Sequence, residues 1–224
     1  MDEIIFIEEL KKINIKISDY QLKQLNIYYN LLKEWNQKIN LTKIIKKEDV
    51  YLKHFYDSLT LTNIYKFEQC QNLCDVGTGA GFPGIVLKII FPHLKVTLIE
   101  SIKKKIFFLT DLIKKLKLND VEIINKRVEE YGKNNREKYD LVVVRALANF
   151  NIICELCLPL VKEKGYFIAM KSQEKIKKDI PNKLGGKIIE IKELFLPYEK
   201  SLRKLIKIKK ILKLIKSIHV LFHK

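Results

Sequence analysis

The chain has 224 residues, a hydrophobic fraction of 47% and a formal net charge of +17. This hydrophobic fraction excludes an intrinsically disordered chain, and the length suits one α/β domain of ordinary size with a small appendage. The positive excess favours a polyanionic partner, with nucleic acid ahead of an anionic membrane surface.

The sequence carries no recognisable targeting or membrane-spanning signal. The start, Met1-Asp2-Glu3, is acidic, and the apolar run that follows it is too short for a signal peptide. No stretch reaches the roughly 18 apolar residues that would cross a bilayer. We therefore expect a cytoplasmic protein that does not associate with membranes, and we expect a monomer.

The N-terminal part is predicted to be helical. Residues 4–13 have helical spacing, Ser18 or Asp19 can cap a second helix that runs to about Asn36, and a third helix is expected over 48–61. Residues 1–65 contain no convincing strand. We predict that they form a helical extension packed on the same domain as residues 66–224.

From about residue 72 the pattern alternates between strands and helices. Strands are predicted at 73–76, 95–99, 121–125, 140–144 and 165–171, and helices at 84–91, 102–117 and 149–160. This alternation predicts an α/β fold of the Rossmann-like type, with a mostly parallel central sheet and helices on both faces. Ligands of such folds bind beyond the carboxyl ends of the strands.

A glycine-rich loop follows the first predicted strand. The segment reads Asp75-Val76-Gly77-Thr78-Gly79-Ala80-Gly81-Phe82-Pro83-Gly84 and leads into an apolar helix. Glycines let the backbone approach a ligand closely and adopt positive φ, and a proline suits the first turn of a helix. A strand, a tight glycine turn and a helix N-terminus in this order are typical of a site for a nucleotide-like cofactor.

Two cofactors are compatible with this loop. Gly79-x-Gly81-x-x-Gly84 matches the dinucleotide fingerprint. The carboxylate of Asp75, however, would repel a pyrophosphate and attract the ammonium and sulfonium groups of S-adenosylmethionine. Glu100, at the end of the next predicted strand, can accept hydrogen bonds from the ribose of either cofactor. The sequence favours S-adenosylmethionine and leaves a dinucleotide-dependent reductase as the alternative.

Further polar groups follow the predicted strands. Arg145 and Lys171 stand at two strand ends and the segment 127–130 follows a third, so polar side chains converge on one rim of the sheet. Cys154-x-x-Cys157 lies on the apolar face of a predicted helix, and we expect two buried thiols there and no metal site.

The C-terminal tail allows two interpretations. Residues 204–211 are predicted to form a final strand. The longer run to Ile218 also fits a basic amphipathic helix that could lie on RNA or on a membrane, which would suit a non-enzymatic binding protein.

Several motifs together resemble one family. In order along the chain they are Trp35-Asn36-x-x-Ile39-Asn40-Leu41-Thr42, His54-Phe55-x-Asp57-Ser58-Leu59, the glycine loop with Phe82-Pro83-Gly84, Arg127-Val128-Glu129-Glu130, Val144-Arg145-Ala146 and Ala169-Met170-Lys171-Ser172. This series resembles the bacterial 16S rRNA guanine-N7 methyltransferases, the glucose-inhibited division protein B family. The resemblance covers about residues 20–175. The tail departs from it, because residues 211–224 lack the Pro-Arg-x-x-Gly stretch common in the family.

The resemblance implies a Rossmann-like S-adenosylmethionine-dependent methyltransferase domain over residues 66–224. Its substrate would be 16S rRNA, or the small ribosomal subunit, methylated on N7 of a guanosine near position 527. The cofactor-binding residues expected from the loop and from the family motifs are Asp75, Gly77, Gly79, Phe82, Glu100, Ser101, Ile102, Val128, Glu129 and Arg145. The residues expected to position the substrate at the catalytic centre are Arg145, Lys171, Asn40 and His54.

The chemistry of this reaction explains why no acid–base pair stands out. N7 of guanine carries a lone pair and no proton, so it can attack a sulfonium methyl group in line without a general base. The protein then has to supply proximity and alignment. An arginine does not deprotonate, so we expect Arg145 to bind a base or a phosphate. A methyltransferase that acts on another RNA or on a small molecule would share the fold and is the alternative function.

Overall fold

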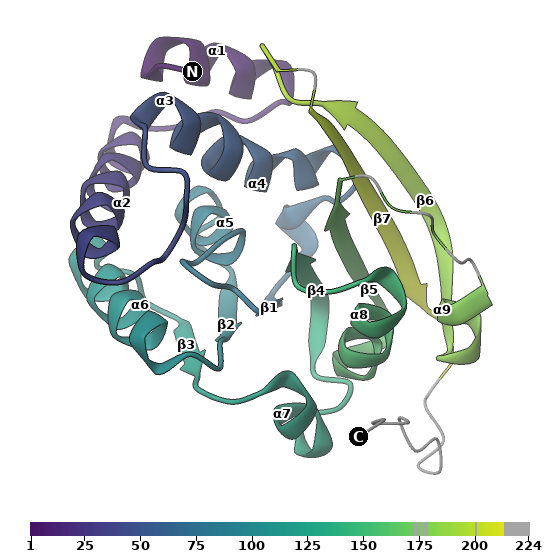
Figure 1. Cartoon of the computed structure of the whole chain (residues 1–224). Helices are drawn as coiled ribbons and strands as arrows, with labels where there is room; N and C mark the ends of the chain where they lie inside the picture. The colour runs from purple at the N-terminus through teal and green to yellow at the C-terminus, as the bar shows by residue number, and fades with distance from the viewer. Residues whose placement is uncertain (173, 175, 177–178, 200, 213–224) are drawn as a thin grey trace.

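The computed structural model describes residues 1–172, 174, 176, 179–199 and 201–212. Its centre is a seven-stranded sheet in the order β3-β2-β1-β4-β5-β7-β6 (Figure 1). The strands are β1 (Asn72–Val76), β2 (Lys95–Ile99), β3 (Val121–Ile124), β4 (Tyr139–Arg145), β5 (Val161–Lys171), β6 (Gly186–Phe195) and β7 (Leu202–Lys210).

The sheet is parallel except at one side. Strands β3, β2, β1, β4 and β5 run parallel, and β7 runs antiparallel to both β5 and β6. The five predicted strands are confirmed, with β5 starting four residues earlier than expected. The predicted final strand is confirmed as β7. Residues 202–210 are therefore not an amphipathic helix, and residues 213–218, the rest of the segment proposed for that helix, lie outside the described residues. Strand β6 was not predicted.

Helices cover both faces of the sheet, as predicted. They are α5 (Gly84–Ile90), α6 (Lys103–Leu116), α7 (Val128–Asn134), α8 (Phe150–Cys157) and α9 (Asp179–Lys183). In β4, Leu141 and Val143 join the buried cluster that contains α5 and α6, whereas Val142 and Val144 join the cluster that contains α7 and α8. Successive side chains of a strand point to opposite faces, so this alternation places the two helix layers on opposite sides. Helix α7 was not predicted.

The N-terminal helices are α1 (Glu3–Lys12), α2 (Asp19–Lys38), α3 (Lys47–Val50) and α4 (Asp57–Leu59). Helix α2 begins where the sequence predicted. The Ser18 hydroxyl accepts the Gln21 N–H at 3.3 Å, and the Gln21 side chain accepts the Ser18 N–H at 2.9 Å. This reciprocal pair satisfies two backbone donors that the helix itself leaves unpaired.

The helix predicted over 48–61 is present as an uninterrupted helical segment, but it is not an α-helix throughout. Residues 51–56 between α3 and α4 form a π-helical turn, and residues 60–63 after α4 form a 3-10 turn. Single π-turns within helices occur frequently at functional sites. The turn carries His54, one of the residues expected in the site.

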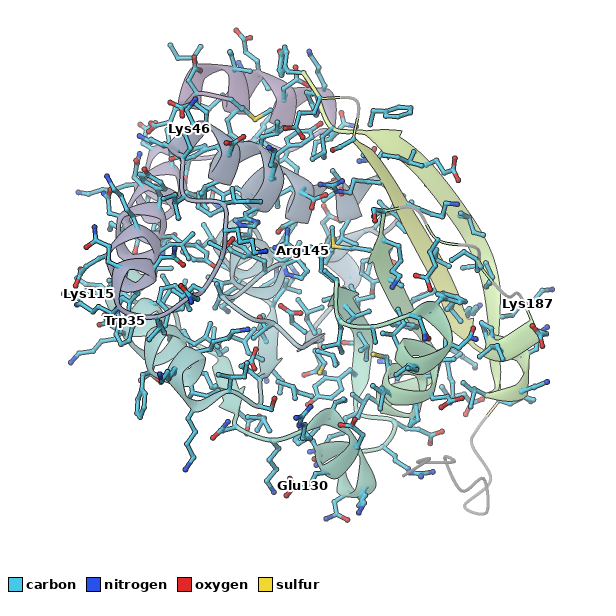
Figure 2. The ribbon with its side chains drawn as sticks, viewed as in Figure 1. Trp35, Lys46, Lys115, Glu130, Arg145 and Lys187 are labelled. Atoms are coloured by element: carbon cyan, nitrogen blue, oxygen red, sulfur yellow. The ribbon has the colours of Figure 1, made fainter. Side chains whose placement is uncertain are left out.

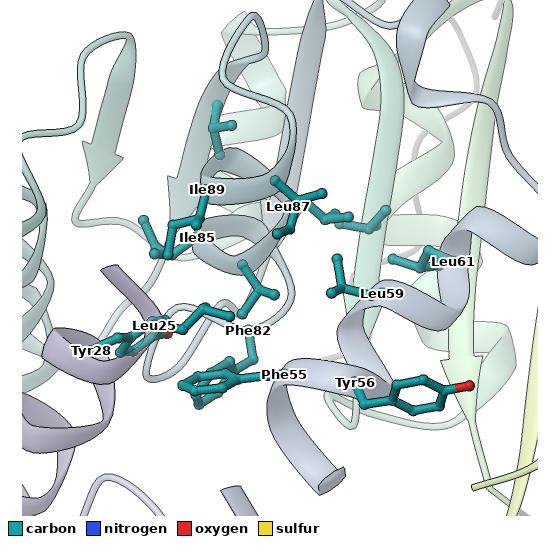
Figure 3. Close-up of a cluster of buried hydrophobic side chains, with 14 of the residues drawn as sticks. Leu25, Tyr28, Phe55, Tyr56, Leu59, Leu61, Phe82, Ile85, Leu87 and Ile89 are labelled. Atoms are coloured by element: carbon teal, nitrogen blue, oxygen red, sulfur yellow. The ribbon is translucent and has the colours of Figure 1, made fainter. Parts of the chain in front are cut away.

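The N-terminal helices share their core with the sheet. Figure 3 shows Leu25 of α2 and Phe55 of the π-turn packed with Phe82 and Ile85, which belong to the glycine loop and to α5. Tyr28 is fully buried and stacks on Phe82 with ring centroids 5.2 Å apart. The helical extension therefore packs on the α/β part, and the boundary near residue 65 stays a prediction.

Two smaller features of the fold concern the cysteines and the membrane. Cys154 and Cys157 are buried free thiols on α8, as predicted, and burial raises the pKa of Cys154 to about 12. Within the described part of the chain, no helix has the length and apolar character that crossing a membrane requires.

Candidate active site

The glycine loop has the backbone that its sequence predicts. Gly77, Gly79 and Gly81 have φ values of +66°, +62° and +95°, a region that side chains with a Cβ rarely adopt. The side chain of Asp75, at the end of β1, fixes the loop through two hydrogen bonds. Its carboxylate accepts the Thr78 hydroxyl at 2.7 Å and the Gly84 N–H at 2.8 Å. Burial raises the pKa of Asp75 to about 6.

A cavity of about 430 Å³ opens beside this loop, at the carboxyl ends of β1, β2 and β4. Six of the ten residues expected to bind the cofactor line it. They are Gly77, Glu100, Ser101, Ile102, Val128 and Glu129. The volume falls in the range of small-molecule sites, about 300–1,000 Å³. Apolar side chains supply one wall, formed by Ile102, Val128, Leu147, Ile152 and Leu156. We call this space the cofactor cavity.

The side chain of Glu100 contacts two backbone segments beside the cofactor cavity, the glycine loop and the residues after β2. One carboxylate oxygen accepts the Gly79 N–H at 3.1 Å, and the other accepts the Ile102 N–H at 2.9 Å. A carboxylate has about four acceptor positions, so two remain for further donors. An acidic group at the end of the second strand, beside an apolar wall, fits the ribose hydroxyls and the adenine of a nucleoside.

The other four residues expected to bind the cofactor lie around this cavity without lining it. Asp75 is completely buried beneath the loop, and its second carboxylate oxygen has no hydrogen-bond partner among the described residues. Gly79 donates to Glu100, and Phe82 is buried with its ring stacked on His54 at 4.4 Å between centroids. Arg145 lines a second cavity. Contact of these four residues with the cofactor stays a prediction.

The second cavity, of about 400 Å³, adjoins the first. Both are lined by Ala146, which follows β4 and has a φ of +51°. Figure 2 shows Arg145 near the middle of the molecule, whereas labelled residues such as Lys46 and Lys187 lie at its periphery. We call this space the substrate cavity, and its lining residues are Ile44, Lys53, His54, Asp57, Arg145, Ala146, Met170, Lys171, Ser172, Glu174 and Arg203.

Arg145 is fixed in the substrate cavity by groups from the N-terminal helices. Its Nη1 donates to the Lys53 carbonyl at 3.0 Å and to the Asp57 carboxylate at 3.3 Å. Its Nη2 lies 3.2 Å from Nδ1 of His54, and its guanidinium lies 5.1 Å above the Phe82 ring. The orientation of the guanidinium is thus set from several directions.

His54 contacts Arg145 as a neutral imidazole. Burial and the charge of Arg145 lower the pKa of His54 to about 3. Nδ1 lies 3.2 Å from Nη2 of Arg145 and 3.1 Å from the Lys53 carbonyl, so it accepts from Arg145 in one tautomer and donates to Lys53 in the other, while Nε2 lies 3.1 Å from the Thr42 hydroxyl. A neutral histidine leaves the positive charge of this contact on the arginine alone.

Lys171 and Asn40 differ from each other in their placement. The Lys171 ammonium lines the substrate cavity, pairs with Glu174 at 2.7 Å and donates to the Ala148 carbonyl, so it holds the segment after β4. Asn40 is exposed and lines neither cavity. The nearby Asn36, in the last turns of α2, holds the loop after the helix, because its side chain accepts the N–H groups of Leu41 and Thr42. Substrate contacts of Lys171 and Asn40 stay predictions.

Four charged residues of the substrate cavity were not predicted from the sequence: Lys53, Asp57, Glu174 and Arg203. Asp57 belongs to the motif His54-Phe55-x-Asp57, so a signal for it was present. Its side chain is 4% exposed and contacts Arg145 and Arg203 at once. Arg203 lies on β7 in a lysine-rich stretch where no local pattern distinguishes it from its neighbours.

The chain has the Rossmann-like fold found in solved methyltransferases. The structure of a 16S rRNA (adenine(1408)-N(1))-methyltransferase from Catenulisporales acidiphilia, solved with S-adenosylmethionine, matches with a TM-score of 0.53 and 12% identity. It covers 65% of this chain and 87% of that one. A precorrin-6y C5,15-methyltransferase from Geobacter metallireducens matches with a TM-score of 0.56 and 16% identity, covering 78% of this chain and 96% of that one. At these identities the likeness concerns the fold alone.

Sequence relatives identify the family. The family model described as rRNA small subunit methyltransferase G matches residues 21–195. Proteins named ribosomal RNA small subunit methyltransferase G are similar to this chain in Macrococcus caseolyticus (44% identity, 94% of this chain and 91% of the relative) and in Bacillus cytotoxicus (49% identity, 88% and 85%). The chain belongs to this family, as the motifs predicted, and the family is S-adenosylmethionine-dependent.

Proposed function

We propose that this protein transfers a methyl group from S-adenosylmethionine to N7 of a guanosine near position 527 of 16S rRNA. The observation that carries the proposal is the pair of adjoining cavities that meet at Ala146. The lining of the cofactor cavity fits a nucleoside. The substrate cavity is lined by four cationic side chains and two carboxylates, and this lining suits part of a polyanion. Family membership supplies the rRNA substrate class, and the base and atom come from the resemblance of the motifs.

The residues of the cofactor cavity fit S-adenosylmethionine. Glu100 retains acceptor positions for ribose hydroxyls, and Ile102, Val128 and Leu147 offer apolar contact for an adenine ring. The bound cofactor would supply an electrophilic methyl group. Because Ala146 lies on both cavities, the reacting atoms of cofactor and base can meet at this junction.

The side chains of the substrate cavity would align the acceptor base without acting as acid or base. Arg145 is fixed by Asp57, the Lys53 carbonyl and His54, so its guanidinium presents donors in one orientation. A neutral His54 adds no second charge that would repel the methylated, cationic guanine. A positioned donor of this kind lowers the barrier by holding the acceptor in an attack geometry. We propose a direct in-line transfer.

The testing experiment is methyl transfer from labelled S-adenosylmethionine to unmethylated 16S rRNA and to 30S subunits, with the modified nucleotide mapped. A single N7-methylguanosine near position 527 is the expected product. Modification of another nucleotide, or of a small molecule instead of RNA, would assign the chain to the alternative acceptor class. Binding of a dinucleotide in place of S-adenosylmethionine would contradict the cofactor.

A non-enzymatic role for the basic tail makes a different prediction. Removal of residues 212–224 would abolish RNA or membrane binding if the tail were the functional part. The enzyme proposed here keeps its cofactor affinity after that truncation, because the described residues that line the two cavities all precede residue 212. Cytoplasmic location and the monomeric state stay predictions.

A further inference from the structure

Arg203 reaches the substrate cavity from a part of the chain far from the motifs. Strand β7 is antiparallel to β5, and its Lys204 pairs with Lys171 at the carboxyl end of β5. The first residues of β7 therefore lie at the same rim as the ends of the parallel strands. Arg203 lines the substrate cavity there, with a side chain that is 20% exposed.

One carboxylate serves two arginines at this place. Oδ1 of Asp57 accepts from Nε of Arg203 at 2.9 Å, and Oδ2 accepts from Nη1 of Arg145 at 3.3 Å. All three side chains are at least four-fifths buried. Among direct contacts, two guanidiniums share one carboxylate, which leaves one positive charge in excess; the buried carboxylate of Asp75 interacts with Arg145 electrostatically without a hydrogen bond to it. His54, which contacts Arg145, is neutral and does not add to it or offset it.

The other cations of the substrate cavity are compensated. Lys171 pairs with Glu174 at 2.7 Å, and Lys53 pairs with Asp49 at 3.0 Å and with Glu199 at 2.7 Å. The two partners of Lys53 do not line the cavity and are 38% and 30% exposed, so solvent screens them from the buried arginines. The excess charge therefore resides on the pair of Arg145 and Arg203.

Two buried guanidiniums that share one counterion are costly, and a guanidinium offers several donors to a phosphate group. In Arg203, Nε donates to Asp57 and Nη1 donates to the Ser201 hydroxyl and the Leu202 carbonyl, so Nη2 is the donor that faces no described acceptor. We propose that Arg203 binds a phosphodiester of the RNA substrate, and that Asp57 is a positioning residue that holds Arg203 and Arg145 in register. This inference rests on the proposed function, because it names the contact by which the RNA backbone enters the substrate cavity. Arg145 is then left to orient the base.

The first test compares R203Q with K204Q. Both substitutions remove one charge from neighbouring positions of β7, but Lys204 pairs with Glu193 at 2.8 Å and does not line the substrate cavity. R203Q should weaken binding of unmethylated 30S subunits about tenfold or more, as expected for the loss of a charged hydrogen bond. The slope of log Kd against log salt should become shallower by about 0.7, the value for one phosphate contact on a single strand. K204Q should change neither quantity.

Cofactor affinity serves as the folding control for every variant, because none of the substituted residues lines the cofactor cavity. If R203Q loses cofactor binding, R203K carries the test. It keeps the charge and loses the fork, so Kd for 30S subunits should rise while the salt slope stays. The variant to evaluate is R203Q if it binds the cofactor, and R203K if it does not. An unchanged affinity of that variant for 30S subunits would contradict the proposed phosphodiester contact of Arg203.

The second test addresses Asp57 through D57N and D57E. D57N removes the charge that holds both arginines, so kcat should fall at least about tenfold while cofactor affinity is kept. D57E retains the charge and should recover part of kcat. A purely structural Asp57 would lower the melting temperature without this pattern of loss and rescue in kcat.

If wild-type enzyme leaves N7 of the guanosine unmodified, the proposed function fails. If wild type methylates it and R203Q and D57N behave as wild type, only this inference fails.

Discussion

The two cavities are built in different ways. The cofactor cavity is formed mainly by four short segments, each at the carboxyl end of one parallel strand: residues 76–77, 99–102, 126–129 and 146–148. The substrate cavity is assembled from Ile44 of the loop before α3, from the π-turn and α4, from the ends of β4 and β5, and from β7. The first depends on local strand–turn–helix geometry, and the second depends on contacts between residues up to 146 positions apart, as between Asp57 and Arg203. Substitutions should therefore separate the two.

The largest effect is expected for R145A at the junction of the cavities. Loss of the oriented guanidinium should reduce methyl transfer at least about a hundredfold, because misplacement of the acceptor by about 1 Å already costs that much. Affinity for S-adenosylmethionine, measured by calorimetry, should stay within a few-fold of wild type. Transfer at the wild-type rate would remove Arg145 from the substrate cavity's function, and loss of cofactor affinity would show that the cavities are not separable.

A smaller effect, confined to the other cavity, is expected for G77A. An added Cβ would lie 2.7 Å from a methyl group of Leu147, and alanine at a φ of +66° is strained by about 1–2 kcal/mol. The loop and Leu147 must shift, so affinity for S-adenosylmethionine should fall about tenfold or more. G132A on α7 is the matched control, because its Cβ meets nothing closer than 3.6 Å. Equal affinities of G77A and wild type would contradict the assignment of the loop.

A third effect, on stability instead of on binding or transfer, concerns the pH dependence of unfolding and isolates His54. The pKa of His54 is lowered to about 3 in the folded protein, against an ordinary value near 6.5. As pH falls below about 6.5 the unfolded chain takes up this proton and the folded protein does not. The stability that neutral His54 contributes is therefore present at pH 7 and is lost as pH falls.

The measurement is urea unfolding of wild type and H54N at pH 7 and pH 5. The free energy of unfolding of wild type relative to H54N should fall by about 2 kcal/mol between these values. Asp75 titrates in the same pH range, but it is present in both proteins, so its contribution cancels in the difference between their free energies of unfolding. The same substitution at the exposed His93 is the control. No change in the difference would mean that His54 is protonated in the folded state.

Sequence reasoning succeeded where a side chain's position follows from its own element. Gly77 and Glu100 come directly after parallel strands, so the period of the apolar pattern places them at the carboxyl rim. Val128 and Glu129 were found through the family motif, since the short helix that carries them had no clear periodic signal. Asn40 was expected in the site because it stands in a motif, yet it lines neither cavity, and Asn36 is the residue that holds the loop after α2.

What the sequence by itself determined is the class of fold, the glycine loop, the cofactor cavity and the family. These depend on hydrophobic period, glycine spacing and residue order, which are properties of short segments. Only the tertiary structure decided that 48–61 contains a π-turn, and that the antiparallel β7 carries Arg203 to Asp57. Those contacts join segments far apart in the chain, and their formation depends on the packing of the whole sheet and its helices. No local propensity encodes them.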